Sequence, residues 1–125
     1  MKLSILVIDD DDAVRRSFQL ALEDSECKLV LVDSGEAGVQ EETERKCDLI
    51  FLDLKMPGLN GVETLKRIRK IDNRVPIYIV TAFHREFMNE LNEAVKEGLC
   101  FELINKPAGA HEIVAIVNKF LVRQG

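Results

Sequence analysis

Acidic side chains stand at two points of this sequence where a short apolar run ends. One run is followed by four consecutive aspartates, residues 9–12, and a later run by Asp53. Carboxylates packed together repel one another, and a divalent cation removes that cost. Oxygen ligands suit Mg²⁺, which keeps some of its waters and can also take a substrate phosphate. We therefore expect Asp9, Asp10 and Asp53 to hold Mg²⁺, with Asp53 as a nucleophile that forms an acyl phosphate.

Two further apolar runs end at Thr81, which carries a hydroxyl group, and at Lys106, which carries an ammonium group. Both groups bind phosphoryl oxygens, the lysine through its charge. Taken singly, each has an ordinary interpretation: a threonine favours strand ends, and a lysine is usually solvated. Asp11 and Asp12 are likewise interpreted as helix caps. The joint placement of acids, hydroxyl and lysine at the ends of successive apolar runs is the specific signal.

The apolar periodicity predicts five strand–helix units of roughly 25 residues each. Parallel strands covered by helices on both faces follow from this alternation, and right-handed crossovers make the sheet doubly wound. Ligands of such sheets gather at the carboxyl ends of the strands, where the acids stand. The order 2-1-3-4-5 is one of two common choices, between which periodicity does not select. The expected strands are residues 4–9, 28–32, 48–53, 75–80 and 100–105, and the expected helices are residues 12–25, 34–46, 62–70, 87–95 and 113–121.

Length and charge narrow the class of protein. The 125 residues are expected to form one domain, 1–125, without linkers or repeats. A net charge of −5 without a basic stripe argues against direct binding of nucleic acid, which draws on phosphate neutralisation. No apolar run approaches the ~20 residues of a membrane span, and the N-terminus does not resemble a signal peptide. The acidic run 41–44 is expected to be a solvated helix face.

Three cysteines, Cys27, Cys47 and Cys100, are widely spaced. Their odd number and the lack of a CxxC pair argue against zinc and against a disulfide framework. We expect buried or half-buried thiols in a reducing compartment, which favours the cytoplasm.

Four segments together resemble the receiver domains of bacterial two-component response regulators, and the likeness covers essentially the whole chain. The most specific is the Asp-x-x-Met-Pro-x-x-x-Gly pattern that runs from Asp53 to Gly61. The matching segments are residues 5–11, residues 48–61, Thr81-Ala82 and Lys106-Pro107.

The resemblance implies a flavodoxin-like α/β fold, with five helices and a five-stranded parallel sheet in the order 2-1-3-4-5. It also implies a signalling phosphoacceptor, whose only chemistry is its own Mg²⁺-dependent phosphorylation and slow dephosphorylation. Asp53 would take the phosphoryl group from a phosphohistidine of a sensor histidine kinase or phosphotransfer protein. By the same resemblance, the side chains of Asp10 and Asp53 and the carbonyl of Lys55 ligate the metal. Asp9 then acts mainly through a metal-bound water.

Further implications concern the phosphoryl contacts and the readout. Thr81 and Lys106 would contact the phosphoryl group, Ala82 would leave room for it, and the Lys106-Pro107 bond would be cis. A downstream effector domain or protein would read the face between the fourth strand and the fifth helix. Phosphorylation-dependent homodimers are a further expectation.

Three features depart from the family pattern. Leu103 stands where the family usually has a tyrosine or phenylalanine, and alternation puts Phe101 on the same face but farther from the site. The interval from Thr81 to Lys106 is a few residues longer than usual. Lys55 and Phe83 occupy two variable positions near the phosphoryl group, and because Phe83 cannot hydrogen-bond a water, slow loss of phosphate is expected.

Three alternatives stay open. An aspartyl phosphatase of another α/β class would have a second acid two residues after the nucleophile, where this chain has Lys55. A flavin or nucleotide binder would have a glycine-rich loop after the first strand, where this chain has four acids. A degenerate receiver-like interaction module could keep the shape without a working switch, to which Leu103 gives weight.

Overall fold

Strands and helices alternate along the chain in the computed structural model, which describes residues 2–124 and the side chains of residues 2–121. The five strands and five helices of this part confirm the predicted alternation. In chain order they are β1 (Leu3–Ile8), α1 (Asp12–Ala21), β2 (Cys27–Val32), α2 (Gly35–Glu44), β3 (Leu49–Leu52), α3 (Gly61–Ile71), β4 (Ile77–Thr81), α4 (Met88–Lys96), β5 (Glu102–Asn105) and α5 (Ala110–Gln124).

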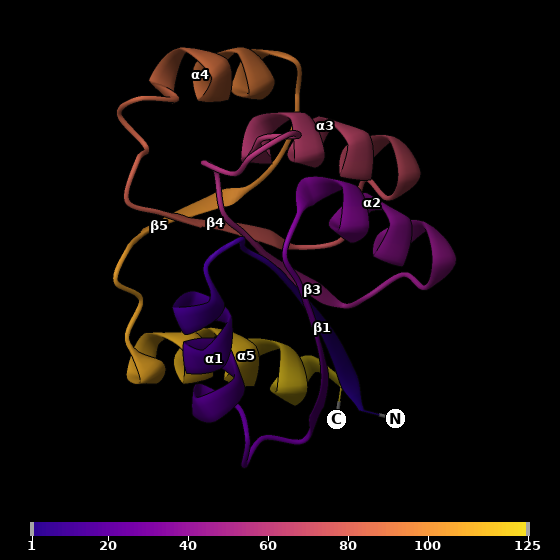
Figure 1. The fold of residues 1–125 in the computed structure, drawn as a ribbon. Helices are drawn as coiled ribbons and strands as arrows, with labels where there is room; N and C mark the ends of the chain where they lie inside the picture. The colour runs from indigo at the N-terminus through magenta and orange to yellow at the C-terminus, as the bar shows by residue number, and fades with distance from the viewer. Residues whose placement is uncertain (1, 125) are drawn as a thin grey trace.

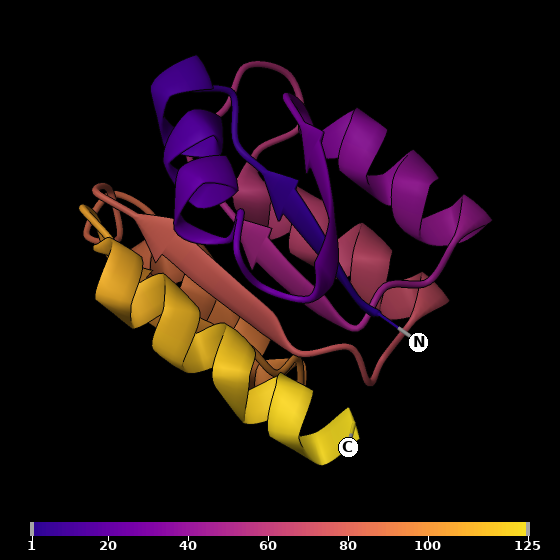
Figure 2. The ribbon, with the colours of Figure 1, turned by 90° about the horizontal axis from the view of Figure 1, so that it is seen from below.

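The strands form one parallel sheet in the order β2-β1-β3-β4-β5. Helices α2, α3 and α4 lie on one face of the sheet, and α1 and α5 lie on the other (Figures 1 and 2). This is the doubly wound, flavodoxin-like arrangement that the resemblance implies. The order brings β1 and β3 together at the centre, so their carboxyl ends are neighbours.

Side-chain alternation along the strands builds a separate core on each face of the sheet. In β1, Leu6 and Ile8 belong to the core on the face covered by α2, α3 and α4, whereas Ile5 and Val7 belong to the core on the face covered by α1 and α5. All four of these side chains are buried, which explains why the central strands read as continuous apolar runs. The predicted apolar stripe of α3 is confirmed, because Val62, Leu65 and Ile68 are buried, and that of α5 is confirmed by its buried Ile113, Ile116 and Val117.

The register of the central strands sets the acids side by side. Ile8 of β1 is paired with Leu52 of β3, so the next residues, Asp9 and Asp53, leave the sheet together. The backbone N–H of Asp53 donates to the carbonyl of Ile8 at 2.9 Å, which extends the pairing to the acceptor position itself.

Several predicted boundaries were too long. Helix α1 ends at Ala21, not at residue 25, because its last intrahelical bond is from the N–H of Leu22 to Phe18 and a polar turn follows. Strand β4 begins at Ile77 and not at residue 75, since Pro76 has no N–H to give to a ladder. Strand β5 begins at Glu102, two residues later than predicted.

The predicted apolar face of α4 was partly wrong. Leu91 and Ala94 are buried, and Phe87 packs against them at the N-cap. Met88 and Val95, which were expected on that same face, are 42% and 59% exposed. Each follows a core-facing position by one residue, and one step of a 3.6-residue helix turns a side chain by about 100° away from the sheet.

Two expectations about polar surface were also wrong. Glu42 is fully buried rather than part of a solvated face, because its carboxylate accepts bonds from the backbone N–H and the thiol of Cys47 at 2.9 and 3.0 Å. Cys100 is exposed, not buried or half-buried, whereas Cys27 and Cys47 are half-buried as predicted.

Candidate functional site

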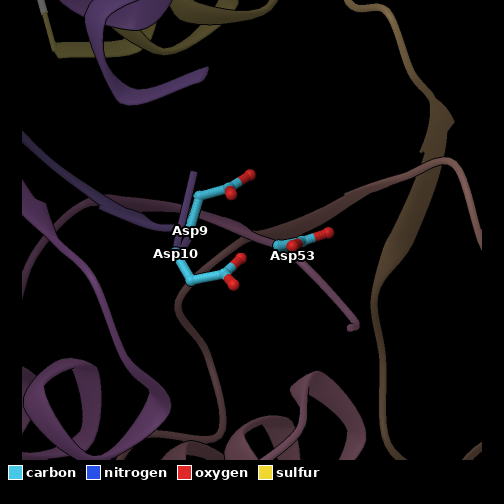
Figure 3. Close-up of side chains that lie close together, drawn as sticks. All are labelled: Asp9, Asp10 and Asp53. Carbon is cyan, nitrogen blue, oxygen red and sulfur yellow. The ribbon is translucent and has the colours of Figure 1, made fainter. Parts of the chain in front are cut away.

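The three acids predicted to hold a metal do converge. Asp9, Asp10 and Asp53 each offer a carboxylate oxygen, and these oxygens all lie within 4.8 Å of one another. Figure 3 shows Asp9 and Asp10 extending from the end of β1 toward the side on which Asp53 lies. Asp9 and Asp53 are 3% and 4% exposed, whereas Asp10 is exposed to solvent. The cluster therefore has a buried base and an open side through which an ion and its waters could enter.

The other two aspartates of the acidic run have structural roles, as predicted. Asp11 is the N-cap of α1, and its side chain accepts a bond from the N–H of Ala13 at 2.9 Å. Asp12 begins the helix, where a negative charge favours the positive end of the helix dipole. The N–H of Asp11 donates to Oδ1 of Asp9 at 3.0 Å, so the cap also fixes the orientation of that buried carboxylate.

Lys106 bridges the two buried acids. Its Nζ lies 2.9 Å from Oδ2 of Asp9 and 3.3 Å from Oδ1 of Asp53. Burial alone would favour the neutral amine, but the hydrogen bond and charge of Asp9, together with the negative charge of Asp53, raise the pKa of Lys106 above its ordinary value. The lysine is therefore held as a cation at the centre of the acidic cluster.

The surroundings of Asp53 disfavour the charged form of its carboxyl group. Burial and then the negative charge of Asp9 raise the pKa of Asp53 to about 6, although Lys106 opposes both effects. Burial also raises the pKa of Asp9. The contact of Asp53 Oδ1 with Lys106 lacks hydrogen-bond geometry, and this buried oxygen has no hydrogen-bond partner among the described residues. Oδ1 of Asp53 is thus held beside the lysine by charge alone, while the residue lines the cavity described below.

Thr81 is fully buried at the end of β4. Its Oγ1 accepts a bond from the N–H of Phe83 at 2.9 Å, and Thr81 is not among the residues that line the cavity described below. Its carbonyl accepts from the N–H of Lys106 at 3.0 Å, so the threonine and the lysine are fixed to each other through the backbone. The Lys106-Pro107 bond is cis, as the resemblance implies.

Gly61, the last residue of the Asp-x-x-Met-Pro-x-x-x-Gly pattern, begins α3 at a position where no side chain fits. Its N–H donates to the carbonyl of Leu54 at 2.7 Å. A Cβ at residue 61 would lie 2.2 Å from the carbonyl oxygen of Asp53 and 2.6 Å from the Cα of Leu54. Because real Cβ atoms do not approach backbone so closely, only glycine lets the start of α3 press against the acceptor residue.

The acids open into a surface cavity of about 660 Å³. Lys55 and Phe83 face each other at this cavity, with Lys55 Nζ 4.6 Å from the centroid of the Phe83 ring. Nζ also forms an ion pair at 3.4 Å with Glu86, a residue that no sequence pattern singles out. The lining residues are Asp10, Asp11, Asp53, Lys55, Met56, Pro57, Phe83 and Lys106.

Leu103 stands where the family usually has an aromatic residue, and Phe101 precedes it by two residues. Leu103 lies on β5 and is 42% exposed, and Phe101 is half-buried against the core beneath α3 and α4. Between Thr81 and Lys106, residues 82–87 connect β4 to α4 and residues 97–101 connect α4 to β5. Among residues 2–124, no helix is both long enough and apolar enough to cross a membrane.

Residues 5–118 of this chain match the family model described as the response regulator receiver domain. The chain belongs to the response regulator receiver family. Relatives of this family include transcriptional regulatory protein AfsQ1 of Streptomyces coelicolor, which is 40% identical over 79 residues that cover 63% of this chain and 35% of that protein. The alkaline phosphatase synthesis transcriptional regulatory protein PhoP of Bacillus subtilis is 31% identical over 123 residues, which cover 98% of this chain and 50% of PhoP.

Solved receiver domains share the fold. A CheY-like receiver domain protein from Methanospirillum hungatei superposes with a TM-score of 0.86 at 21% identity, over 99% of this chain and 97% of that chain. Chemotaxis protein CheY4 of Vibrio cholerae gives a TM-score of 0.80 at 20% identity, over 95% of this receiver and 98% of CheY4.

The family membership identifies the chain as a receiver domain of two-component signalling, with the phosphoacceptor role that the sequence predicts. It does not favour the degenerate module, the phosphatase or the flavin binder. The receiver spans about half the length, or less, of the curated relatives named above.

Proposed function

We propose that Asp53 of this receiver accepts a phosphoryl group from a phosphohistidine on a sensor histidine kinase or phosphotransfer protein. The observation that carries the proposal is the position of Asp53, a buried acid that lines a surface cavity and whose Oδ1 lies 3.3 Å from Lys106 Nζ without a hydrogen-bond partner among the described residues. In the transfer, an oxygen of Asp53 forms a bond to phosphorus as the phosphorus–nitrogen bond to the histidine breaks. The imidazole leaves with its electron pair and takes a proton from solvent.

The donor set fits Mg²⁺. Three carboxylates face one nearby ammonium group, so the cluster keeps an excess of negative charge that an ion would neutralise. The donors are all oxygens, which are the ligands that Mg²⁺ prefers. Asp10 and Asp53 would bind directly with the carbonyl of Lys55, and Asp9 would act through a water. The bound ion supplies charge neutralisation for the transferring group.

The remaining residues position and stabilise the phosphoryl group. Lys106 would keep its contact with Asp9 and turn its other contact from the Asp53 carboxylate to a phosphoryl oxygen. Thr81 would donate its hydroxyl proton to another oxygen, because Oγ1 already accepts from Phe83. The only chemistry of the domain would then be its own phosphorylation and the slow reversal of it.

The readout follows from the position of Thr81. A movement of Thr81 toward the phosphoryl group would pull on Phe83 and so on the connection to α4. The face between β4 and α5 would then bind a downstream effector domain or protein, or a second phosphorylated copy, in the cytoplasm. The exposed Met88, Val95 and Leu103 supply apolar surface for such a contact.

Beryllofluoride, which mimics a phosphoryl group on aspartate, tests the proposal by NMR titration with and without Mg²⁺. Wild type should show Mg²⁺-dependent shifts at Asp53, Thr81 and Lys106 that extend into α4. Asp53→Asn should show none of them. Equal responses of the two proteins would exclude Asp53 as the acceptor, and shifts confined to the site would mean acceptance without transmission.

A further inference from the structure

The side chain of Lys55 joins two loops across the rim of the acceptor cavity. Lys55 belongs to the loop between β3 and α3, and Glu86 belongs to the connection between β4 and α4. Their ion pair at 3.4 Å, with Nζ 4.6 Å from the Phe83 ring centroid, gives Lys55 two contacts on the same connection. Lys55 also lines the cavity that contains Asp53, whereas Glu86 does not. The lysine can therefore face either Glu86 or the acceptor site.

The ion pair between Lys55 and Glu86 is weak enough for Lys55 to leave Glu86 for another anion. The side chains of Lys55 and Glu86 are each 52% exposed, and exposed pairs contribute little because water and salt screen them. A phosphoryl group carries close to two negative charges and three strong acceptor oxygens. A single lysine placed between a solvated carboxylate and such a group is drawn to the group with the larger charge.

Glu86 belongs to the connection between β4 and α4, whose internal hydrogen bonds are long. This connection is built from successive turns, with N–H bonds from Glu86 to Phe83, from Phe87 to His84 and from Met88 to Arg85 at 3.1 to 3.4 Å. The helix that follows has no side-chain cap at Phe87. Its start is therefore fixed mainly by the contacts of the connection with its surroundings, of which the Lys55 pair is one.

We propose that Lys55 changes partner when Asp53 is phosphorylated: Glu86 holds it in the unphosphorylated domain, and the phosphoryl group takes it and releases the connection to α4. Glu86 is then a positioning residue that sets the balance between the two states through Lys55. The inference rests on the proposed phosphorylation of Asp53. It gives this chain a route from the acceptor to α4 that needs no aromatic side chain at position 103.

A double-mutant cycle on beryllofluoride affinity in Mg²⁺ tests the exchange. Glu86→Gln keeps the shape of the side chain and removes its charge, so Lys55 no longer has to leave a partner. The dissociation constant should fall by about two- to fivefold, the range of an exposed ion pair. Lys55→Gln should weaken binding, and Glu86→Gln added to Lys55→Gln should then change nothing. Additive effects would overturn the exchange, because they would mean that Glu86 acts only through its general charge.

The chain contains a matched control. Lys66 and Glu97, 39% and 51% exposed, form a second ion pair at 3.5 Å that joins α3 to the end of α4 away from the cavity, and Glu97→Gln should leave the affinity unchanged. In NMR spectra, Glu86→Gln without beryllofluoride should shift the amides of residues 83–88 part of the way toward their bound positions. If Glu97→Gln matches Glu86→Gln in both readouts, the exchange is wrong. If wild type binds no beryllofluoride at all, it is the phosphoacceptor proposal that fails.

Discussion

The ammonium group of Lys106 lies 3.3 Å from Oδ1 of Asp53, at the edge where β5 and β3 end. The same ammonium group contacts Asp9 at 2.9 Å, so one cation serves two buried carboxyl groups. One positive charge does not offset both: burial raises the pKa of Asp9, and burial and then the negative charge of Asp9 raise the pKa of Asp53. The metal-free domain therefore keeps an unfavourable concentration of charge at the place where a phosphoryl group and an ion would bind.

Removal of one of these charges should stabilise the metal-free protein. Asp53→Asn keeps the size of the side chain and abolishes its repulsion with Asp9, so we expect the thermal unfolding midpoint at pH 7.5 in EDTA to rise by several degrees. Asp24→Asn, in the exposed turn after α1, serves as the control and should leave the midpoint unchanged. A lower midpoint for Asp53→Asn would mean that the carboxylate is better satisfied than its contacts indicate.

The pH dependence of stability should have an unusual sign for an aspartate. The pKa of Asp53 is raised from its ordinary 3.8 to about 6 in the folded state, so the folded protein binds the proton more tightly than the unfolded chain does. This contribution favours folding at low pH and is lost as the pH rises from about 4 through about 6. Urea unfolding of wild type and Asp53→Asn across this window, without Mg²⁺, should show a stability difference that grows with pH.

Binding of Mg²⁺ should weaken in acid for the same reason. The ion must displace the proton of Asp53, so the apparent affinity should fall by about tenfold for each pH unit below about 6 and level off above it. Mg²⁺ titrations followed by NMR between pH 5 and pH 8 measure this. An affinity that does not change between pH 5 and pH 7.5 would place the ion away from Asp53.

The sequence predicted the sheet and the convergence of Asp9, Asp10 and Asp53 far better than it predicted the surface. The central strands are buried on both faces, so their apolar runs are continuous. The acids at positions 9 and 53 therefore mark clearly where these two strands end. Thr81 and Lys106 were found for the same reason. Glu86 carried no such signal, because an exposed acid in a turn resembles any other until the fold brings Lys55 beside it. The prediction that Glu42 is solvated was wrong because its burial depends on Cys47, in the loop after α2, and on Asp72, at the end of α3.

Glu42 offers a test of that misreading. Glu42→Ala would leave the buried N–H of Cys47 without its acceptor and create a cavity, so we expect a loss of about 2 kcal/mol or more in the free energy of unfolding. Glu42→Gln keeps an acceptor oxygen and should cost less. The exposed Glu44→Ala, in the same helix, should change the stability by no more than about 0.5 kcal/mol. Equal effects of the two alanine variants in urea unfolding would argue that Glu42 is solvated after all.

Gly61→Ala should damage both the fold and the site. The added Cβ would meet the backbone of Asp53 and Leu54, neither of which can yield as a flexible side chain would, so we expect a loss of at least about 2 kcal/mol. The surviving folded protein should also bind beryllofluoride more weakly, because Asp53 has moved. Gly109→Ala is the matched control, since a Cβ there meets nothing within 4 Å, and it should be neutral or slightly stabilising. Wild-type affinity and stability in Gly61→Ala would show that α3 can shift without disturbing the acceptor.

Loss of the phosphoryl group should be slow, because the rim of the cavity offers a water little help. Phe83 is 43% exposed there and has no group that could orient a water, and the ammonium of Lys55 lies over its ring. After phosphorylation with acetyl phosphate and removal of the reagent, we expect wild type to keep its phosphate for minutes or longer, measured by phosphate-affinity gel. Phe83→Asn supplies an amide that can hydrogen-bond the attacking water and should shorten the half-life several-fold. Leu20→Asn, which changes an exposed apolar residue on α1, should leave the half-life unchanged. A wild-type half-life of seconds would contradict this account of the rim, because attack by water would then proceed without any help from residue 83.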